Sequence, residues 1–267
     1  MKIFVSIVSH RHHDVIINLG AIKALSQFSE IQVVCRDNKP VVKLKRYCEK
    51  YNAHYFTNDF EQGFAANNNE NYMYCKFELG MKENDYFILM NPDVFITKSN
   101  IQRLIDSLKK KEINFGVANL FLDREGMVQD DNIRLYPKFR DFLKTYILNK
   151  RVTMVDRRKG LSSSIDYWAS CAFMIVKAGI YNQLNGLDER YYMYCEDIDF
   201  SYRTNKAGYQ LEYLENVRAV HFRRCASKQF LSRYFFWHVQ SVFKYSFGKK
   251  KETALTSRLE YQNHYTK

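Results

Sequence analysis

The chain has 267 residues, of which 46% are hydrophobic, and it contains only 3 Pro and 10 Gly. This composition is typical of a globular protein that can bury a full core, and it excludes a disordered or low-complexity chain. The net charge of +12 indicates an anionic partner, for which nucleic acid, anionic lipid and a sugar-nucleotide or diphosphate substrate all qualify.

Strands and helices alternate along the first 110 residues. Apolar runs rich in β-branched or aromatic residues predict strands at residues 2–9, 31–35, 54–57 and 86–90. Helical spacing or helix-start signals predict helices at residues 14–28, 41–51 and 70–81, and a further helix that Ser99 caps and that ends at residue 110. This rhythm predicts an α/β fold with a mostly parallel sheet and helices on both faces.

The pattern changes after residue 115. Strand-like pieces are followed by a basic stretch at residues 138–159, an apolar run at 165–176, an acidic segment and a helix through residue 206. We see no convincing linker, so the simplest division is one domain at residues 1–221 and a C-terminal appendage at residues 222–267.

The appendage is basic and aromatic. Residues 222–251 contain no Asp or Glu, and Phe230, Tyr234, Trp237, Ser241 and Tyr245 recur at steps of three and four. This spacing predicts an amphipathic helix on an anionic membrane surface. A helix that packs on the domain or in a dimer interface would show the same pattern, so both interpretations stay open.

The cysteine pattern and the hydropathy of the chain predict its cellular compartment. The six cysteines include no C-x-x-C pair, which argues against a zinc site or a disulfide framework and for reduced thiols in a cytoplasmic protein. The apolar N-terminal run is too short for a signal peptide. The sequence contains no stretch of 18 apolar residues, so no membrane span is predicted.

The acidic segment at residues 194–200 places Glu196, Asp197 and Asp199 beside Tyr194 and Phe200. Carboxylates in an aromatic pocket have raised pKa values, because desolvation disfavours the charged form, and such a group suits a general base. The alternative is a solvated helix start, where acidic residues are favoured by the helix dipole.

Acidic and amide side chains also follow two predicted strands. Asp37 and Asn38 come after one strand, and Asn91-Pro92-Asp93 after another, so both sets are expected at the same crevice beyond the strand ends. Asp37 and Asn38 can accept hydrogen bonds from a base or ribose, and Asp93 can hold a hard divalent cation. The alternatives are simple turns, in which Asp and Asn are common.

The ordered set of motifs resembles family 2 glycosyltransferases with the GT-A fold, and above all bacterial rhamnosyltransferases that extend polyprenyl-diphosphate-linked sugars for surface polysaccharide of the O-antigen type. The resemblance spans roughly residues 3–225. Each motif is weak alone, and their order makes the resemblance specific. The matching segments are Val8-Ser9-His10, Asp37-Asn38, residues 63–68, Asn91-Pro92-Asp93, Arg134-Leu135-Tyr136-Pro137 and residues 166–208.

The resemblance implies an inverting transfer in which Asp197 is the catalytic base, and Glu196 and Trp168 contact the acceptor. Asp93 would be the surviving acid of the family's Asp-x-Asp motif for Mg²⁺ or Mn²⁺; the first acid is replaced by Asn91. His221 would be a second metal ligand, although a lone His is more often structural. The implied donor-binding residues are Ser9, Asp37, Asn38, Asn67, Asn91 and Asp93.

The implied partners are a nucleotide-sugar donor, with dTDP-rhamnose expected, a lipid-linked saccharide acceptor and the cytoplasmic face of the plasma membrane, to which the protein would bind peripherally. A UDP-hexose donor is the nearest alternative, and a homodimer stays open. A nucleic-acid-binding protein would also use the basic charge, but the chain shows no recognised motif for it, and that hypothesis leaves Asp93 and Asp197 unexplained. A scaffold without catalytic activity is the remaining alternative.

Overall fold

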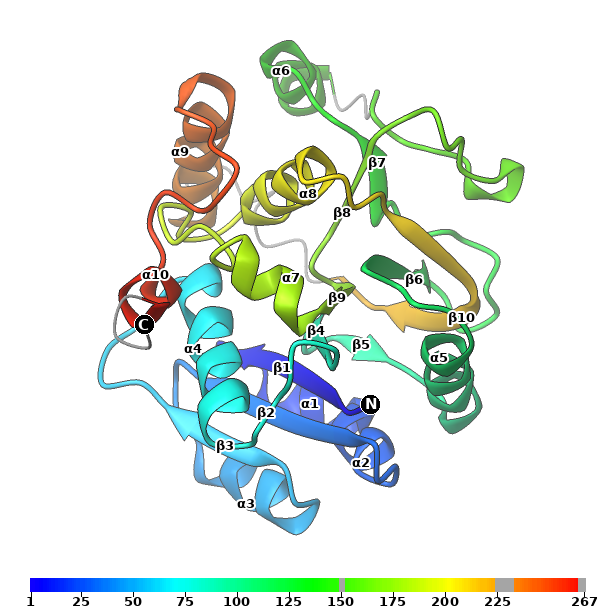
Figure 1. The fold of residues 1–267 in the computed structure, drawn as a ribbon, viewed down its shortest axis with the longest axis vertical. Coiled ribbons are helices and arrows are strands. Elements are labelled where there is room, and N and C mark those ends of the chain that lie inside the picture. Colours follow the sequence, from blue (N-terminus) through cyan, green and yellow to red (C-terminus); the bar gives the residue numbers. More distant parts are fainter. Residues whose placement is uncertain (149–151, 224–232, 264–267) are drawn as a thin grey trace.

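The computed structural model describes residues 1–148, 152–223 and 233–263 (Figure 1). One eight-stranded sheet has the order β3-β2-β1-β4-β9-β6-β10-β5, and β7 pairs with β8 in a separate ribbon. The strands are β1 Ile3–Ser9, β2 Ile31–Asp37, β3 His54–Thr57, β4 Tyr86–Met90, β5 Val94–Phe95, β6 Phe115–Phe121, β7 Ile133–Leu135, β8 Tyr167–Ala169, β9 Phe173–Lys177 and β10 Glu212–His221.

Helices cover both faces of the large sheet, as Figure 1 shows. Side chains alternate along a strand, so Ile3 and Val5 of β1 pack with one set of helices and Phe4 with the other. The first face carries α1 His13–Leu19, α2 Ala21–Leu25, α3 Val42–Lys50 and α5 Lys98–Lys110, and the second carries α4 Phe64–Phe77, α7 Ala178–Gln183 and α8 Glu196–Lys206.

The predicted α/β class is confirmed. Strand β1 is parallel to β2 and β4, β2 is parallel to β3, and β6 is parallel to β10, whereas β9 runs antiparallel between β4 and β6. The carboxyl ends of β1, β2, β4, β6 and β10 therefore lie at one edge of the sheet. Ligands of open α/β sheets bind at such an edge.

Several predicted boundaries differ from the structure. The helix expected at residues 14–28 is broken at Gly20, whose φ of 69° is left-handed, so α1 and α2 are separate. The helix predicted at residues 70–81 is α4, which begins at Phe64 and ends at Phe77. The N-cap of α5 is Thr97, not Ser99, because its hydroxyl accepts a hydrogen bond from the N–H of Asn100 at 3.3 Å.

The C-terminal region forms α9 Arg233–Phe247 and α10 Arg258–Asn263, and the basic stretch contains α6 Phe139–Leu148 and a short 3₁₀ turn, Arg157–Lys159. Phe230 of the predicted aromatic helix and Cys225 lie outside the described residues. The five described cysteines are buried free thiols. Among the helices in the described part of the chain, none has the length and apolar character needed to cross a membrane.

Candidate active site

A cavity of about 910 Å³ opens at the sheet edge where these strands end. The start of α8, the ribbon β7–β8 and one face of α9 complete its walls. It brings together residues predicted from distant parts of the sequence, and a cavity of this size can hold most of a nucleotide sugar. The predicted site residues in its lining are Asn38, Asn91, Asp93, Trp168, Glu196, Asp197 and His221.

Ser9, Asp37 and Asn67 lie behind the cavity wall, where all three are fully buried. Asp37 is not among the cavity-lining residues, and its carboxylate accepts hydrogen bonds from the hydroxyl of Tyr55 at 3.1 Å and the N–H of Lys39 at 3.3 Å. The amide of Asn67 donates to the carbonyl of Gly63 at 2.8 Å. These side chains shape the wall that carries Asn38.

A left-handed turn aims the two acids of α8 into the cavity. Tyr194 and Cys195 have φ of 70° and 65°, a region that costs a residue other than Gly about 1–3 kcal/mol. The turn places Glu196 and Asp197 in the first helical turn, where the helix dipole favours negative charge. Strain of this kind in a cavity wall is a reason to examine Glu196 and Asp197 as functional residues.

Burial separates the protonation states of these two acids. Desolvation raises the pKa of Asp197 to about 6, against the hydrogen bond from the N–H of Ile198 at 2.9 Å and the charge of Arg134. Desolvation and the neighbouring Asp197 hold the pKa of Glu196 well above its usual range. With a pKa near 6, Asp197 is mostly a carboxylate at neutral pH and can take a proton, whereas burial and the charge of Asp197 favour the protonated form of Glu196.

Asp93 and His221 form the second acidic centre of the cavity. His221, the last residue of β10, places Nε2 at 3.3 Å from Oδ1 of Asp93, and its Nδ1 lies 2.7 Å from Oδ2 of Asp130. Burial opposes the charge on His221, but the two carboxylates outweigh it and raise its pKa to about 9. Burial likewise opposes the charge on Asp93, and His221 nevertheless keeps the pKa of Asp93 below its usual value.

The donor set of this centre fits a divalent cation. Asp93 Oδ1 and His221 Nε2 converge at the cavity, and a cation bound between them would displace the Nε2 proton that His221 carries at neutral pH. The contact of Nδ1 with Asp130 is the carboxylate–histidine arrangement that orients a metal-binding imidazole. No group of three His, Cys, Asp or Glu that could hold a metal occurs within the described residues. Asp93 and His221 would supply two ligands, and Mg²⁺ commonly takes the remainder from substrate phosphates and water.

Sequence reasoning did not identify Asp130 or Arg134 as site residues. Arg134 pairs with Asp131 at 2.7 Å, and its guanidinium lies 5.2 Å from the ring centre of Trp168. Trp168 is also fixed by a hydrogen bond from its Nε1 to the carbonyl of Leu135 at 3.0 Å. Arg134 thus carries positive charge close to both Trp168 and Asp197; its only sequence signal was its place in a family motif.

The inner face of α9 packs on the cavity instead of standing apart from the domain. Trp237 and His238 line the cavity, and their rings lie 4.5 Å from Tyr192 and 5.0 Å from Tyr194. The hydroxyl of Ser241 donates to the carbonyl of Met193 at 2.9 Å. Packing on the domain, one of the two interpretations of this helix, is therefore observed for its inner face.

Comparison with known proteins decides the family. No protein-family model matches the chain. Over 249 residues the chain is 30% identical to rhamnosyltransferase WbbL of Escherichia coli strain K12, and the match covers 93% of this chain and 94% of that protein. The chain belongs to the family of GT-A glycosyltransferases that includes this rhamnosyltransferase. The resemblance stated from the sequence motifs is confirmed.

Two further similarities concern this glycosyltransferase. The chain is 27% identical over 145 residues to an N-acetylglucosaminyl-diphospho-decaprenol L-rhamnosyltransferase of Mycobacterium tuberculosis. The matched region is 52% of this chain and 47% of that protein. The mannosyltransferase PcManGT of Pyrobaculum calidifontis, solved with GDP-Man and Mn²⁺, superimposes with a TM-score of 0.58 at 13% identity. That superposition covers 94% of this chain and 65% of the solved chain, and it confirms the GT-A fold.

Proposed function

We propose that this glycosyltransferase moves L-rhamnose, with inversion, from dTDP-rhamnose to a polyprenyl-diphosphate-linked saccharide in surface polysaccharide synthesis. The observation that carries the proposal is the meeting, in one cavity, of a carboxylate poised as a base and an Asp–His pair suited to a metal diphosphate. The names of the similar rhamnosyltransferases support the donor sugar and the lipid-linked acceptor.

Asp197 takes the proton of the acceptor hydroxyl while that oxygen attacks the anomeric carbon. The bond from the anomeric carbon to the diphosphate oxygen breaks on the opposite side, and the nucleoside diphosphate leaves. Glu196, whose pKa burial raises well above its usual range, forms a hydrogen bond with the acceptor, and the ring of Trp168 stacks on an apolar sugar face. These residues orient the hydroxyl toward the donor.

The donor diphosphate would lie beside Asp93 and His221, which would hold Mg²⁺ or Mn²⁺, with the amide of Asn91 at the same end of the cavity. The chemistry supplied by the bound cation is neutralisation of the charge that develops on the leaving diphosphate. Asn38 contacts the nucleotide directly, whereas Ser9, Asp37 and Asn67 support the wall from behind.

Calorimetric titration with dTDP and UDP, each with and without Mn²⁺, tests the proposed function. We expect binding that depends on Mn²⁺, with dTDP bound more tightly than UDP. Tighter binding of UDP would replace the proposed donor with a UDP-hexose. If the folded protein binds neither nucleotide, the scaffold and nucleic-acid hypotheses return.

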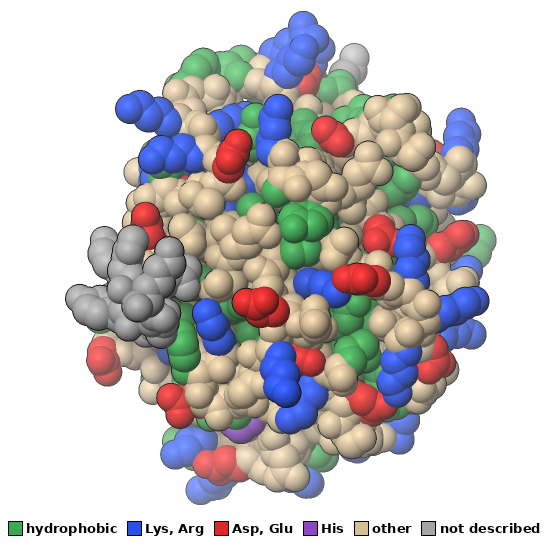
Figure 2. Space-filling model, in the orientation of Figure 1, with side chains coloured by type: hydrophobic (Ala, Val, Ile, Leu, Met, Phe, Trp, Pro, Cys, Tyr) green, Lys and Arg blue, Asp and Glu red, His purple; other side chains and the backbone are tan. Residues whose placement is uncertain are grey.

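The outer sides of α6 and α9 together form an apolar patch, which we call the α6–α9 patch. It consists of the exposed Leu143, Phe243 and Phe247 and the partly buried Phe139, whose ring contacts both other phenylalanines. The side chains of Phe243 and Phe247 are 51% and 67% exposed. Exposed Lys and Arg flank it at positions 138, 140, 144, 249 and 251. Figure 2 shows blue and green side chains together at the upper end of the molecule, where Figure 1 places α6 and α9.

We propose that the α6–α9 patch contacts the anionic lipid surface from which the acceptor is drawn, so that the protein is peripheral on the cytoplasmic face of the plasma membrane. Aromatic side chains enter the interface, and the flanking cations are attracted to anionic headgroups. Residues 222–267 then form an appendage with two roles, because α9 lines the cavity with one face and meets lipid with the other.

Sedimentation with vesicles of phosphatidylglycerol and phosphatidylcholine tests this contact. We expect the double variant Phe243→Ser, Phe247→Ser to bind at least about tenfold more weakly, since each partly exposed Phe loses apolar burial in the interface. The matched control is Phe77→Ser, an exposed phenylalanine at the end of α4, which should bind like wild type. Equal binding of the double variant and wild type would refute the lipid contact.

A further inference from the structure

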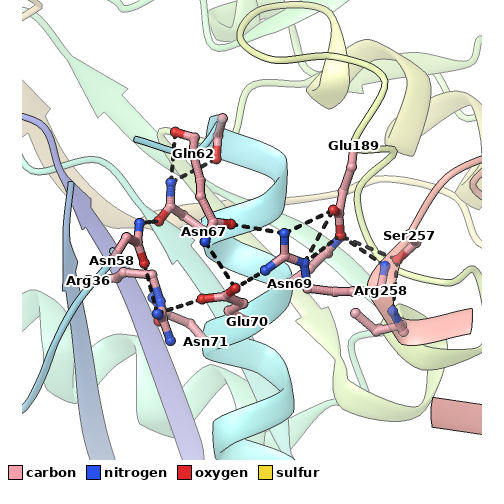
Figure 3. A network of polar contacts seen from close by, with 12 residues as sticks. Arg36, Asn58, Gln62, Asn67, Asn69, Glu70, Asn71, Glu189, Ser257 and Arg258 are labelled. Carbon is pink, nitrogen blue, oxygen red and sulfur yellow. Dashed lines mark hydrogen bonds and ion pairs between the residues drawn. The ribbon is translucent and has the colours of Figure 1, made fainter. Parts of the chain in front are cut away.

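Arg258, the first residue of α10, connects the C-terminal segment to the nucleotide end of the cavity (Figure 3). Its Nε donates to the two carboxylate oxygens of Glu189 at 3.0 and 3.2 Å, and its Nη1 pairs with Glu70. Its Nη2 donates to the side-chain oxygen of Gln62 at 2.9 Å. One guanidinium thus joins α4, the turn before α4 and the segment before α8.

Gln62 carries this connection into the cavity. Its backbone N–H donates to Oδ1 of Asn38 at 3.1 Å, and its carbonyl accepts from Nδ2 of the same amide at 2.9 Å. Gln62 and Asn38 both line the cavity. The backbone of Gln62 therefore fixes which way the Asn38 amide points, and Arg258 fixes the side chain of Gln62.

A second route runs from Arg258 to the same amide through Glu70. Oε2 of Glu70 lies 2.5 Å from Nη1 of Arg36, whose Nη1 also donates to Oδ1 of Asn58 at 3.0 Å. Nδ2 of Asn58 then donates to Oδ1 of Asn38 at 2.7 Å. Figure 3 shows the part of this route from Arg258 through Glu70 to Arg36, beside α4. Because two arginines face two glutamates in a partly buried place, removing one arginine leaves a carboxylate poorly paired.

The segment around Arg258 also holds the chain that leads to the catalytic acids. The N–H of Glu189 donates to the carbonyl of Thr256 at 2.8 Å, and the N–H of Leu255 donates to Asp188 at 2.9 Å. Farther along, the carbonyl of Tyr192 accepts from the N–H of Phe64 at 2.8 Å. The turn at Gln62 and the approach to Glu196 are thus fixed against each other.

The hydrogen bonds that the Asn38 amide already makes determine which ligand group it can bind. Its oxygen accepts from Gln62, Asn58 and Asn67, and one of its two N–H groups donates to Gln62. Among the described residues no acceptor takes the second N–H, which is therefore available to a ligand. A carbonyl oxygen of a pyrimidine base is an acceptor of the required kind, and both thymine and uracil carry one.

We propose that Arg258 is a positioning residue for the nucleotide donor, which acts through Gln62 to orient the Asn38 amide toward the pyrimidine base. The inference rests on the proposed function, because it takes the nucleotide to lie at Asn38. Arg258 lies outside the cavity lining and more than 190 positions after Gln62 in the chain, yet it would help to determine donor affinity.

The test measures dTDP affinity by calorimetry in the presence of Mn²⁺, together with donor KM and kcat. For Arg258→Gln we expect Kd and donor KM to rise about tenfold while kcat and acceptor KM change less than about twofold, the pattern of lost donor binding. Arg258→Lys keeps the charge without the planar fork, so it should recover part of the affinity. The control is Glu252→Ala, an exposed position in the same segment, with wild-type values expected.

A double-mutant cycle with Gln62→Ala tests the route. If Arg258 acts through Gln62, the double variant should bind dTDP about as weakly as Gln62→Ala alone. Additive losses would overturn the route through Gln62 in favour of the one through Glu70, and unchanged Kd in a folded Arg258→Gln protein would overturn the positioning role. A lower kcat together with higher KM values for both donor and acceptor would show a structural role instead. Absence of nucleotide binding in wild type would overturn the proposed function itself, and the inference with it.

Discussion

Asp197→Asn is expected to lower kcat by about 10²- to 10⁴-fold, the usual contribution of a general base, with dTDP affinity close to that of wild type. The amide has the shape of the carboxylate but cannot take the acceptor proton. Turnover assays and calorimetry on the same preparation separate the two effects. Asp166→Asn, an exposed carboxyl before β8, is the control and should turn over normally. Activity of Asp197→Asn close to that of wild type would remove Asp197 from the role of base.

The pH dependence of kcat gives an independent readout of the same group. Burial raises the pKa of Asp197 to about 6, and the base acts only when deprotonated. We therefore expect kcat to rise with pH through about 6 and to level off above it, with about a tenfold loss for each pH unit below. Since Glu196 and Asp197 are neighbouring acids, the observed pKa belongs to the pair.

Asp93→Ala is expected to remove the gain in dTDP affinity that Mn²⁺ provides in wild type, and to lower turnover with it. The substitution takes away one of the two side chains that converge at the proposed cation site and leaves His221 with Asp130. The effect is measured as the Kd of dTDP with and without Mn²⁺. We expect the substitution to raise this Kd about tenfold or more when Mn²⁺ is present and to leave it unchanged when Mn²⁺ is absent.

The control for Asp93→Ala is Asp106→Ala, an exposed aspartate on α5 that lies outside the cavity lining. It should keep both the affinity and its metal dependence. Metal dependence that survives in Asp93→Ala would show that Asp93 does not hold the cation, and the centre formed with His221 would then need another role.

The sequence predicted the acids of the site better than their surroundings. Asp93 follows an apolar strand and Asp197 begins a helix, so local patterns identify both. Asp130, which contacts His221, comes from a loop 91 positions earlier in the chain, and only the sheet brings the two together. No local signal announces the left-handed turn at Tyr194 and Cys195, because neither residue favours that conformation.

The limits of pattern reading also show in α4 and α9. The helix α4 buries Asn67, Asn68, Asn69 and Asn71, residues that usually mark turns, so its start was placed too late. These amides are satisfied by contacts across the fold, such as that of Asn69 with the carbonyl of Leu187 at 2.8 Å. For α9, spacing predicted an amphipathic helix, but it could not say which face meets the domain.

The contacts of Arg258 with Glu70 and Glu189 bear on how the protein is made. A ribosome-bound chain that ends before residue 258 already contains Asp93, Glu196 and Asp197, yet Glu70 and Glu189 still lack their shared arginine. Contacts over 188 positions form late, since the intervening chain must be ordered first. Nascent chains are thus expected to carry Asp93, Glu196 and Asp197 before they acquire a nucleotide pocket of full affinity, because Arg258 is synthesised after all three.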